Sequence, residues 1–197
     1  LQQPNNSLLA LQTTVSSNFE RDCVELWFGK DLTPDFFGWV VPENGDIARV
    51  GIASRERVKN RFLKFLKKRT GKTKKPDVGG VIKYGLIEQS VTNNVLLVGD
   101  AACQVKPFSG GGIIYGLIGA GHAGIACIKA LKKEDFSEEF FKKEYEKKWK
   151  KKLNWPIMKG LFLSGLIHGM PDWLFDAFIS FGDVFKPLLK WIDVDFL

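Results

Sequence analysis

Short runs of alternating apolar and polar residues occupy the first part of the chain. Strands are predicted at residues 11–18, 23–28, 36–41 and 47–53, because side chains on a strand alternate between its two faces. Asn44-Gly45 is a strong turn signal between the last two runs. The pattern therefore predicts a mainly antiparallel sheet, which can bury one face and present the other to a ligand or a second domain.

Helical spacing follows these runs. Residues 55–69 place apolar side chains on one side of a helix that Gly71 is expected to end, namely Val58, Phe62, Phe65 and Leu66. A short strand is predicted at residues 81–87. Asp135 and Glu138 resemble a capping box at the start of a very basic helix, expected to reach about residue 153. The expected fold class lies between α+β and α/β.

The rest of the chain is organised around residues 95–124, with the sequence VLLVGDAACQVKPFSGGGIIYGLIGAGHAG. Four apolar residues at its start predict a fully buried strand, as in a parallel sheet. Asp100 follows this strand, and a polar loop leads to three glycines that open a long helix. Because ligands of such sheets bind beyond the carboxyl ends of the strands, Asp100 is a candidate binding residue.

The chemistry of this stretch suits a flat, electron-rich ligand. Glycines at positions 110, 111 and 112 carry no Cβ, so the backbone can take positive φ and approach a ring closely. The N–H groups and positive dipole end of the following helix favour an anion or a heterocycle. Asp100 can accept hydrogen bonds from the hydroxyls of a ribitol or ribose. These features predict a flavin across the helix start; the alternative is a tight turn in which Asp100 only caps the helix.

At these residues the sequence resembles a known family. Residues 99–102 (Gly-Asp-Ala-Ala) and 107–113 (Pro-Phe-Ser-Gly-Gly-Gly-Ile) are similar to the second flavin-binding motif of the geranylgeranyl reductase family, within the FAD-dependent hydroxylase-like oxidoreductases. The resemblance implies FAD as cofactor, Asp100 as the ribitol ligand, and helix-start N–H groups that stabilise negative charge on the reduced flavin. The implied cofactor-binding residues are Gly99, Asp100, Pro107, Gly110, Gly111, Gly112 and Ile113.

The same stretch contains a literal G-x-G-x-x-G at Gly119, Gly121 and Gly124. It lies inside the predicted helix instead of directly after a strand, so it lacks the structural context of a dinucleotide-binding fingerprint. A glycine in a helix interior costs on the order of 1 kcal/mol relative to alanine. We therefore expect these three glycines to form a close-packing face.

A second resemblance lies in the predicted sheet. Residues 34–42, with the sequence PDFFGWVVP, are similar to the P-x-x-Y-x-W-x-F-P motif that lines the isoprenoid cavity of geranylgeranyl reductases. Period two places Phe37, Trp39 and Val41 on one face, and spacing alone allows either a sheet core or the wall of a lipid tunnel. The resemblance favours the tunnel, with these three side chains lining the substrate. Phe37 replaces the motif's tyrosine, so that hydroxyl is missing.

The resemblance covers mainly residues 8–141 and corresponds to the C-terminal half of the family's proteins. It implies a substrate-domain sheet with one helix (residues 1–90), a strand, loop and helix of the FAD domain (residues 91–132) and a basic, aromatic helical region (residues 133–197). No G-x-G-x-x-G follows a strand here, so the ADP half of FAD is expected to bind a missing N-terminal half or a partner chain. The expected fold is an incomplete FAD-dependent hydroxylase-like fold.

The implied activity is reduction of isoprenoid double bonds in geranylgeranyl lipids by hydride transfer from reduced flavin. A prenyl lipid is accordingly the expected substrate, and no catalytic acid can be named from these residues. Two rivals stay open. One is another FAD-dependent enzyme of the same class, either a quinone-linked dehydrogenase or a monooxygenase; the other is a non-catalytic membrane-binding module.

Composition bears on partners. The 197 residues are 45% hydrophobic, enough for a substantial core, with a formal charge of +7. Lysines gather at residues 64–75 and 142–152, which favours anionic surfaces, nucleic acid and acidic lipid headgroups alike; a solvated helix face is the alternative. Of the two anionic surfaces, the membrane is the expected partner and nucleic acid is not. From residue 155 the chain is aromatic but interrupted by charges, so short helices that pack on the sheet or lie on a membrane are expected, not a spanning helix.

Cysteine and histidine usage bears on compartment and metals. The three cysteines form no C-x-x-C spacing, which favours a reducing compartment. The two histidines have no second ligand at useful spacing, so no metal site is expected. Residues 1–12 lack the pattern of a signal peptide. The expected location is cytoplasmic, with peripheral binding to the inner face of the cell membrane as an extension of that expectation.

Overall fold

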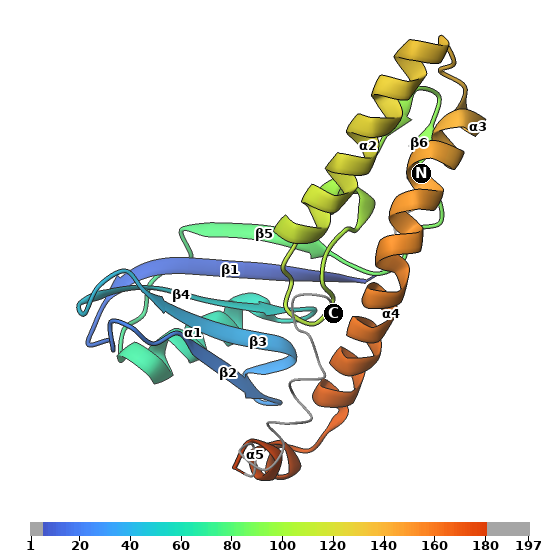
Figure 1. Cartoon of the computed structure of the whole chain (residues 1–197). Coiled ribbons are helices and arrows are strands. Elements are labelled where there is room, and N and C mark those ends of the chain that lie inside the picture. Colours follow the sequence, from blue (N-terminus) through green and yellow to red (C-terminus); the bar gives the residue numbers. More distant parts are fainter. Residues whose placement is uncertain (1–5, 181–197) are drawn as a thin grey trace. The chain divides into compact units, whose positions relative to one another are not determined.

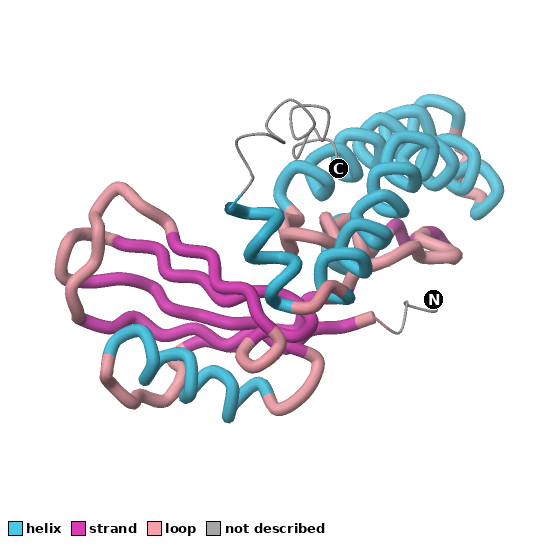
Figure 2. Tube along the Cα trace, turned by 90° about the horizontal axis from the view of Figure 1, so that it is seen from below, coloured by secondary structure: helices cyan, strands magenta, loops and turns pink. Residues whose placement is uncertain are grey.

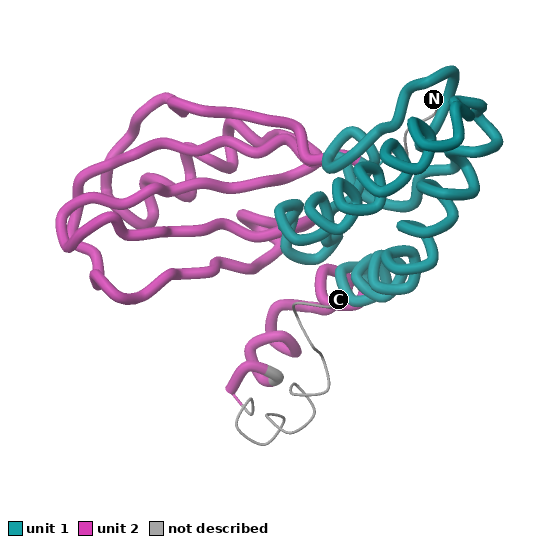
Figure 3. Tube along the Cα trace, turned by 45° about the horizontal axis from the view of Figure 1, so that its top comes forward, with its two compact units in different colours: residues 1–6, 83–165, 182–197 teal, residues 7–82, 166–181 magenta. Residues whose placement is uncertain are grey.

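The computed structural model describes residues 6–180. They form two compact units (Figure 3). The sheet unit comprises residues 7–82 and 166–180, and the helical unit comprises residue 6 and residues 83–165. Each unit has its own hydrophobic core. The boundaries expected at residues 90 and 132 rest on the family resemblance and stay a prediction about the whole protein.

The sheet unit is built on a five-stranded sheet with the strand order β2-β3-β4-β1-β5 (Figure 1). β1 spans Ser7–Ser16, β2 Glu25–Gly29, β3 Thr33–Pro42, β4 Ile47–Ser54 and β5 Val78–Lys83. Neighbouring strands from β2 to β1 pair antiparallel, which confirms the antiparallel sheet predicted from the alternating runs. The register places Trp39 opposite both Leu26 and Gly51, so these three residues share one face.

The helix α1, Val58–Thr70, covers one face of this sheet (Figure 2). As predicted, its buried side chains are Val58, Phe62, Phe65 and Leu66. Gly71 ends the helix with a φ of 69°, a conformation that favours glycine. The other face of the sheet is named the open face, and it contains Gln12, Leu26, Phe28, Phe37, Trp39, Val41 and Gly51.

The helix α5, Asp172–Ser180, also belongs to the sheet unit. Asp172, in its first turn, accepts the backbone N–H of Lys30 with its two carboxylate oxygens at 3.2 and 3.3 Å. One of these oxygens also lies 3.7 Å from the position that a Cβ would take on Gly29. The turn between β2 and β3 is therefore joined directly to the start of α5.

Two strands have the limits that differ most from the prediction. The first spans Ser7–Ser16 instead of residues 11–18, because its pairing with β4 runs from Leu9 opposite Ser54 to Ser16 opposite Ile47. The strand predicted at residues 81–87 is replaced by Val78–Lys83. Gly85 has a φ of 122°, which is not an extended conformation, so the chain leaves the strand before it.

The helical unit contains α2 (Ile113–Lys133), α3 (Glu138–Phe141), the π-helical segment η2 (Lys142–Glu146) and the part of α4 (Lys147–Gly169) up to residue 165. The long helix predicted after the three glycines is thus confirmed. One side of α2 packs against the helical segments that follow it (Figure 1). The shared core includes Tyr115, Ala126, Ala130, Phe141, Tyr145, Trp149, Leu153 and Ile157.

The basic helix has a different cap from the one predicted. Ser137 is the N-cap, and its hydroxyl accepts the backbone N–H of Phe140 at 3.2 Å. Asp135 instead accepts the backbone N–H of Ser137 at 3.0 Å. Ser137 directly precedes the first helical residue, whereas Asp135 lies two residues earlier, so the Ser137 hydroxyl takes the capping role.

The same helix also continues past residue 153, where it was expected to end. α4 reaches Gly169 with Pro156 inside it, although proline removes one helical hydrogen bond. Leu153, Ile157 and Gly160 are all buried on one side. Tertiary packing on both sides of Pro156 therefore maintains the helix.

The fully buried strand of a parallel sheet that was predicted at residues 95–98 is not found in the structure. Only Val95–Leu96 (β7) is a strand, and it pairs antiparallel with Val91–Thr92 (β6). Val95 is 48% exposed, whereas the prediction was a fully buried strand of a parallel sheet. Such a strand needs neighbours that cover it. Within residues 6–180 the only strand paired with β7 is β6.

Candidate functional site

One turn of 3-10 helix, η1 (Gly99–Ala102), carries the expected ribitol ligand Asp100. Gly99 has a φ of 64°, a left-handed conformation that suits glycine. Its N–H donates to the side-chain oxygen of Gln104 at 2.8 Å, and the Gln104 N–H donates to the Gly99 carbonyl at 3.0 Å. Asp100 is exposed, so the turn holds its carboxylate at the surface.

Gln104 connects this turn to two helical segments. Its side chain is fully buried, and its amide nitrogen donates to the Tyr145 hydroxyl at 3.2 Å. The Tyr145 hydroxyl donates in turn to the carbonyl of Leu97. At Gly119 of α2, a Cβ would overlap the Gln104 amide. Because buried polar groups are costly to leave unpaired, this network fixes the Asp100 turn against α2 and η2.

The glycines of the G-x-G-x-x-G pattern differ in role. Gly119 is a close-packing position, as predicted, because Gln104 fills the space beside it. For Gly121 and Gly124 close packing stays a prediction. Both are exposed, and a Cβ at either would meet no atom within 4 Å in the described part of the chain. They lie on the side of α2 that faces away from the core of the helical unit.

The loop before α2 is closed by its own backbone. The Lys106 N–H donates to the Gly111 carbonyl at 3.0 Å, and the Gly110 N–H donates to the Lys106 carbonyl at 2.8 Å. Of the three consecutive glycines, only Gly110 has a positive φ, of 69°. Pro107 is buried, and a Cβ on Gly160 of α4 would lie 2.9 Å from its ring. Pro107 therefore packs the loop against α4.

The start of α2 presents an open surface beside Asp100. A Cβ on Gly112, the N-cap, would lie 2.8 Å from the Asp100 Oδ1, so glycine is needed between the carboxylate and the helix. A Cβ on Gly111 would meet the Ser109 Oγ at 3.4 Å and nothing closer, and Ile113 is 80% exposed. A carboxylate, a helix N-terminus and a surface without Cβ atoms thus meet here. This arrangement fits the ribitol and ring of a flavin.

Burial affects two ionisable groups near this turn. Cys103 is fully buried, and burial raises the pKa of its thiol. The thiolate is therefore disfavoured, and Cys103 is a packing residue. Burial also raises the pKa of Tyr115, in the first turn of α2, to about 12. Its buried hydroxyl has no hydrogen-bond partner among residues 6–180, and it stays protonated at neutral pH.

The three expected substrate-lining residues lie on the open face, opposite α1. Trp39 lies across Gly51, where a Cβ would overlap the indole ring, and its Nε1 donates to the Gln12 side-chain oxygen at 2.9 Å. The rings of Phe37 and Trp39 are 6.2 Å apart, and Val41 is 37% exposed. The core of the sheet unit lies under α1, so this stripe is not part of that core.

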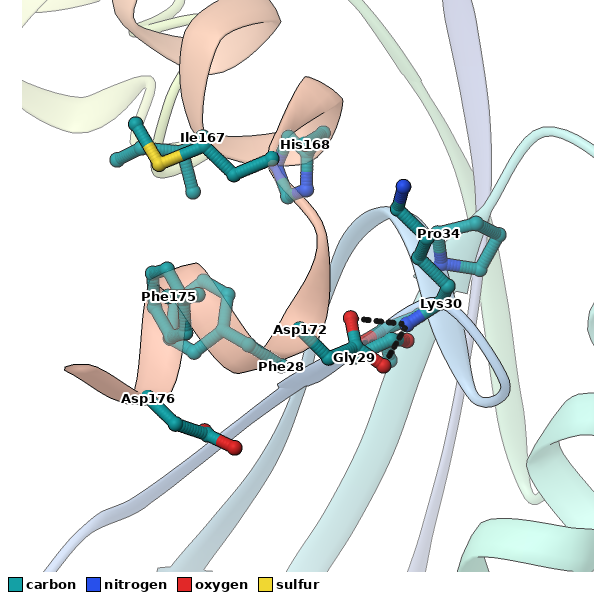
Figure 4. A pocket seen from close by; sticks show the side chains of 11 residues that line it. Phe28, Gly29, Lys30, Pro34, Ile167, His168, Asp172, Phe175 and Asp176 are labelled. Carbon is teal, nitrogen blue, oxygen red and sulfur yellow. Dashed lines mark hydrogen bonds between the residues drawn. The ribbon is translucent and has the colours of Figure 1, made fainter. Parts of the chain in front are cut away.

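A pocket of about 150 Å³ adjoins one end of this stripe (Figure 4). Its lining includes Pro34, the first residue of the P-x-x-F-x-W-x-x-P segment, together with residues of the β2–β3 turn and of the segment 167–176. Sequence reasoning missed three of its residues, Phe28, His168 and Phe175. The alternation at residues 24, 26 and 28 was the signal available for Phe28, and no pattern marked the other two.

The outward side of α2 is apolar from the start of the helix to Leu131. This outer face of α2 contains large exposed side chains, from 48% to 80%: Ile113, Ile114, Leu117, Ile125, Ile128 and Leu131. Among the described helices, α2 alone has the length and composition that could cross a membrane, and 22% of its most apolar window is buried. Those two properties are weak evidence for a span, because core helices share them.

Comparison with curated proteins finds relatives of about twice the length. No family model matches the chain. It is 34% identical over 168 residues to a digeranylgeranylglycerophospholipid reductase of Methanocaldococcus jannaschii, which covers 80% of this chain and 42% of the relative. It is 30% identical over 190 residues to digeranylgeranylglycerophospholipid reductase 2 of Methanococcoides burtonii, covering 92% of this chain and 44% of the relative. The chain thus spans about half the length of the curated relatives it matches.

Comparison with solved structures identifies the fold. A geranylgeranyl bacteriochlorophyll reductase-like protein from Thermoplasma acidophilum matches with a TM-score of 0.77 and 23% identity, over 89% of this chain and 47% of that chain. A flavin-dependent halogenase matches with a TM-score of 0.53 and 17% identity, over 76% of this chain and 30% of that chain. The expected fold, part of the FAD-dependent hydroxylase-like fold, is confirmed.

Proposed function

We propose that this chain, which belongs to the geranylgeranyl reductase family, forms the flavin-ring half of a longer FAD-dependent enzyme that reduces isoprenoid double bonds of geranylgeranyl lipids. The observation that carries the proposal is the meeting of the Asp100 carboxylate with the start of α2, 2.8 Å from the Cβ position of Gly112. The substrate class comes from the relatives, which are named digeranylgeranylglycerophospholipid reductases. Because the chain spans about half their length, we expect it to be inactive alone.

In this proposal the residues around the start of α2 bind and orient the flavin. Asp100 accepts hydrogen bonds from the ribitol hydroxyls. The backbone N–H groups of residues 110–113 lie at the positive end of the helix dipole, which favours negative charge on the reduced ring. Gly99 and Pro107 act indirectly, by holding the turn and the loop. The reduced flavin, when bound, supplies the hydride.

The open face is the proposed surface for the isoprenoid chain. Phe37, Trp39 and Val41 offer a continuous apolar stripe, which binds hydrocarbon by removing it from water. Gly51 and Gln12 hold the Trp39 indole in place, so its position is set before a ligand arrives. Phe37 lacks a hydroxyl and cannot act as a proton donor, and we assign no proton donor within residues 6–180.

The outer face of α2 is the proposed docking surface for the remaining half of the protein, which would carry the ADP site. No Asp, Glu, Lys or Arg occurs in α2 before Lys129. Contiguous apolar patches of this kind are rarely left uncovered in folded proteins. Gly121 and Gly124 lie on the same side and leave room for a close neighbour.

A peripheral contact with an anionic membrane is a second part of the proposal. On the side of α4 opposite its buried residues, the exposed fractions of Trp155, Met158 and Phe162 are 62%, 48% and 75%. Helical spacing places these three residues on one face. Lys151 is exposed one turn earlier, and the Lys159 Nζ lies 5.4 Å from the Trp155 ring centroid. Aromatic rings flanked by lysines suit a lipid headgroup region. Sedimentation with neutral and anionic vesicles tests this contact, and equal binding to both would contradict it.

The activity is tested on the complete protein. We expect the purified protein to show flavin absorbance, and to add hydrogen to a geranylgeranyl lipid in the presence of a reductant, which mass spectrometry detects. Retained flavin without any mass gain would favour another flavoprotein of the class. A protein that neither contains flavin nor retains added FAD after desalting would be a non-catalytic module.

Substitution of Gly111 tests the flavin site itself. Gly111→Leu should leave the fold intact, because the first added atom meets only the Ser109 Oγ at 3.4 Å. The rest of the side chain would cover the helix start, so the complete protein should lose its bound flavin on desalting. Gly80→Leu, in an open position on the edge strand β5, is the control and should keep it. Normal flavin content in Gly111→Leu would refute the assignment.

A further inference from the structure

The two edges of the sheet are finished differently. β2 forms one edge and β5 the other (Figure 1). β2 is five residues long, carries the charged Glu25, and shifts its register with β3 between Trp27 and Gly29. α5 also lies against β2, because the ring centroids of Phe28 and Phe175 are 5.0 Å apart. Short length, a charge, a bulge and a covering element all keep an edge strand from pairing with another chain, so the β2 edge is protected.

The edge formed by β5 lacks these features. Residues 78–82 have the sequence VGGVI, without a charge or a proline, and Val78 and Val81 are 63% and 59% exposed. Among residues 6–180, β1 is the only strand that pairs with β5. The outer side of β5 therefore presents a row of backbone groups that no strand in the described part of the chain pairs with. Such an edge is a ready template for a further strand.

A hydrogen bond directly before β5 indicates which backbone groups point outward. The Asp77 N–H donates to the Gln12 carbonyl of β1 at 2.9 Å. Successive residues of a strand direct their N–H and C=O groups to opposite sides, so every second residue after Asp77 faces β1. In agreement, a Cβ on Gly79 would lie 3.4 Å from the Ala10 carbonyl oxygen. The residues that direct their backbone groups away from β1 are Val78, Gly80 and Ile82.

The charges beside β5 bear on which strand fits this edge. Lys74 and Lys75 precede β5 and Lys83 ends it, and the one acidic residue between positions 71 and 83 is Asp77. Asp77 already pairs with the Lys74 Nζ at 2.8 Å. An antiparallel pair of two β5 strands would bring Lys83 of one copy toward the lysines before β5 of the other copy, which is unfavourable. A second copy of this chain is therefore a poor partner, and a strand with acidic neighbours is a good one.

We propose that the outer edge of β5 binds a strand from the remaining half of the protein, which extends the sheet by one strand. The inference rests on the proposed function only in that this chain is part of a longer protein, and it requires neither flavin nor reduction. The chain covers 42% and 44% of two of its relatives, so the part outside it is long enough to supply a strand. Backbone hydrogen bonds would hold that strand, and Val78 and Val81, on opposite faces of β5, would each contact its side chains.

Hydrogen–deuterium exchange tests the pairing, in this chain and in the complete protein, without added flavin. The amides of Gly80 and Ile82 should exchange at least about a hundredfold more slowly in the complete protein, because each would donate to the incoming strand. The amides of β2 are the internal control, since that edge is protected in another way, and their exchange should change far less.

A proline at position 80 should remove the pairing. Gly80→Pro deletes an outward N–H and places its ring at the edge, which an edge strand tolerates on its open side. In the complete protein, exchange at Ile82 should become at least about tenfold faster in this variant. Gly80→Ala is the matched control: it keeps the N–H, and its methyl group enters open space, so the protection should stay. Gly80→Leu keeps the same N–H and leaves the edge open.

Each outcome decides one claim. Equal exchange of Gly80 and Ile82 in the two wild-type proteins, or full protection of Ile82 in Gly80→Pro, overturns the added strand. If Gly80→Pro also exposes the buried amides of residues 48–53, the variant is misfolded and the wild-type comparison decides alone. Protection that grows with protein concentration, together with a dimer in light scattering, assigns the edge to a second copy and overturns the partner. Protection in a complete protein that binds no flavin leaves the strand standing while the proposed function fails, and reduction without protection does the reverse.

Discussion

The helices α1 and α2 both carry apolar side chains, but their surroundings differ. In α1, Phe62, Phe65 and Leu66 are fully buried against the sheet, and lysines occupy the other side. In α2, one side packs in the helical unit, while Ile113 and Leu117 on its outer face are 80% and 66% exposed. The sheet unit thus completes its own core, and the helical unit leaves an apolar surface uncovered.

The difference teaches how an apolar stripe should be interpreted. A stripe indicates that something covers it, and the partner can be near or far in the sequence. For α1 the cover is the sheet of its own unit, chiefly β4, directly before it in the sequence, and β1. For the outer face of α2 the described residues contain no such cover, and the chain spans about half the length of its relatives. We therefore expect the sheet unit to be stable by itself, and the helical unit to fold in this chain but to gain stability where the remaining half of the protein covers α2.

The largest expected effect separates these two helices. Phe65→Ala should destabilise the sheet unit by about 3–5 kcal/mol, because the ring is fully buried and packs edge-on against Trp27 at 5.5 Å. Ile128→Ala removes a side chain that is 55% exposed and should change the stability of this chain by less than about 0.5 kcal/mol.

Urea denaturation of both variants, in this chain and in the complete protein, measures the contrast. Ile128→Ala should become distinctly more costly in the complete protein if, as proposed, the remaining half covers the outer face of α2. The comparison breaks down if Ile128→Ala is as costly in the shorter chain as in the longer one, or if Phe65→Ala is tolerated.

A smaller effect separates two glycines on opposite sides of α2. Gly119→Ala should destabilise the helical unit by about 1–3 kcal/mol, since Gln104 must move and lose its bonds to Gly99 and Tyr145. Gly121→Ala adds a methyl group in open space and should stabilise this chain by up to about 1 kcal/mol.

Flavin retention in the complete protein is a second measurement that compares Gly119→Ala with Gly121→Ala. Gly119→Ala should lower flavin affinity because the Asp100 turn loses its support, whereas a loss in Gly121→Ala would come from impaired docking of the other half. Equal stability of the two variants in the shorter chain would show that the Gln104 contact does not hold the turn.

The smallest effect concerns pH and belongs to the sheet unit. Glu25 and Arg69 form an ion pair of 2.5 Å between Oε1 and the guanidinium NH2, with side chains 29% and 19% exposed. The hydrogen bond from Arg69 is the main cause that lowers the pKa of Glu25. Since the folded pKa lies below the ordinary value of 4.5, the stabilisation is present above that pH and is lost as pH falls through the folded pKa.

Glu25→Gln should therefore reduce the stability of the sheet unit by about 1 kcal/mol near neutral pH, and should flatten the fall of stability in acid. Thermal melts between acid and neutral pH measure both. Glu43→Gln is the control, because its pair with Arg49 is more exposed, at 40% and 57%. A change in acid stability as large in Glu43→Gln as in Glu25→Gln would contradict the assignment.

Patterns of local origin predicted much of this structure. The antiparallel sheet, the buried side of α1 and the helix after the glycines all follow from periods that report burial against neighbours close in the sequence. The meeting of Asp100 with Gly112 could also be predicted, because a short loop joins the η1 turn to α2. The cofactor and substrate expectations came instead from the resemblance to a family.

Contacts between distant segments could not be predicted in the same way. The bond between Gln104 and Tyr145 joins residues 41 positions apart, and the contact of Phe28 with Phe175 joins β2 to α5. No periodicity encodes such pairs. The short strand at Val95 shows the converse: an apolar run indicates burial, but strand pairing depends on neighbours that its own sequence does not specify.

The hydrogen bond from the Gly99 N–H to Gln104 also makes one backbone proton a reporter of motion. This proton can exchange with deuterium when its hydrogen bond to Gln104 breaks, which requires the Gln104 side chain to move away from its place beside Gly119. The exchange rate at a single position thus measures how often α2 separates from the turn that carries Asp100. A molecule bound across the turn and the helix would slow that exchange, so occupancy of the site could be followed without colour and without turnover.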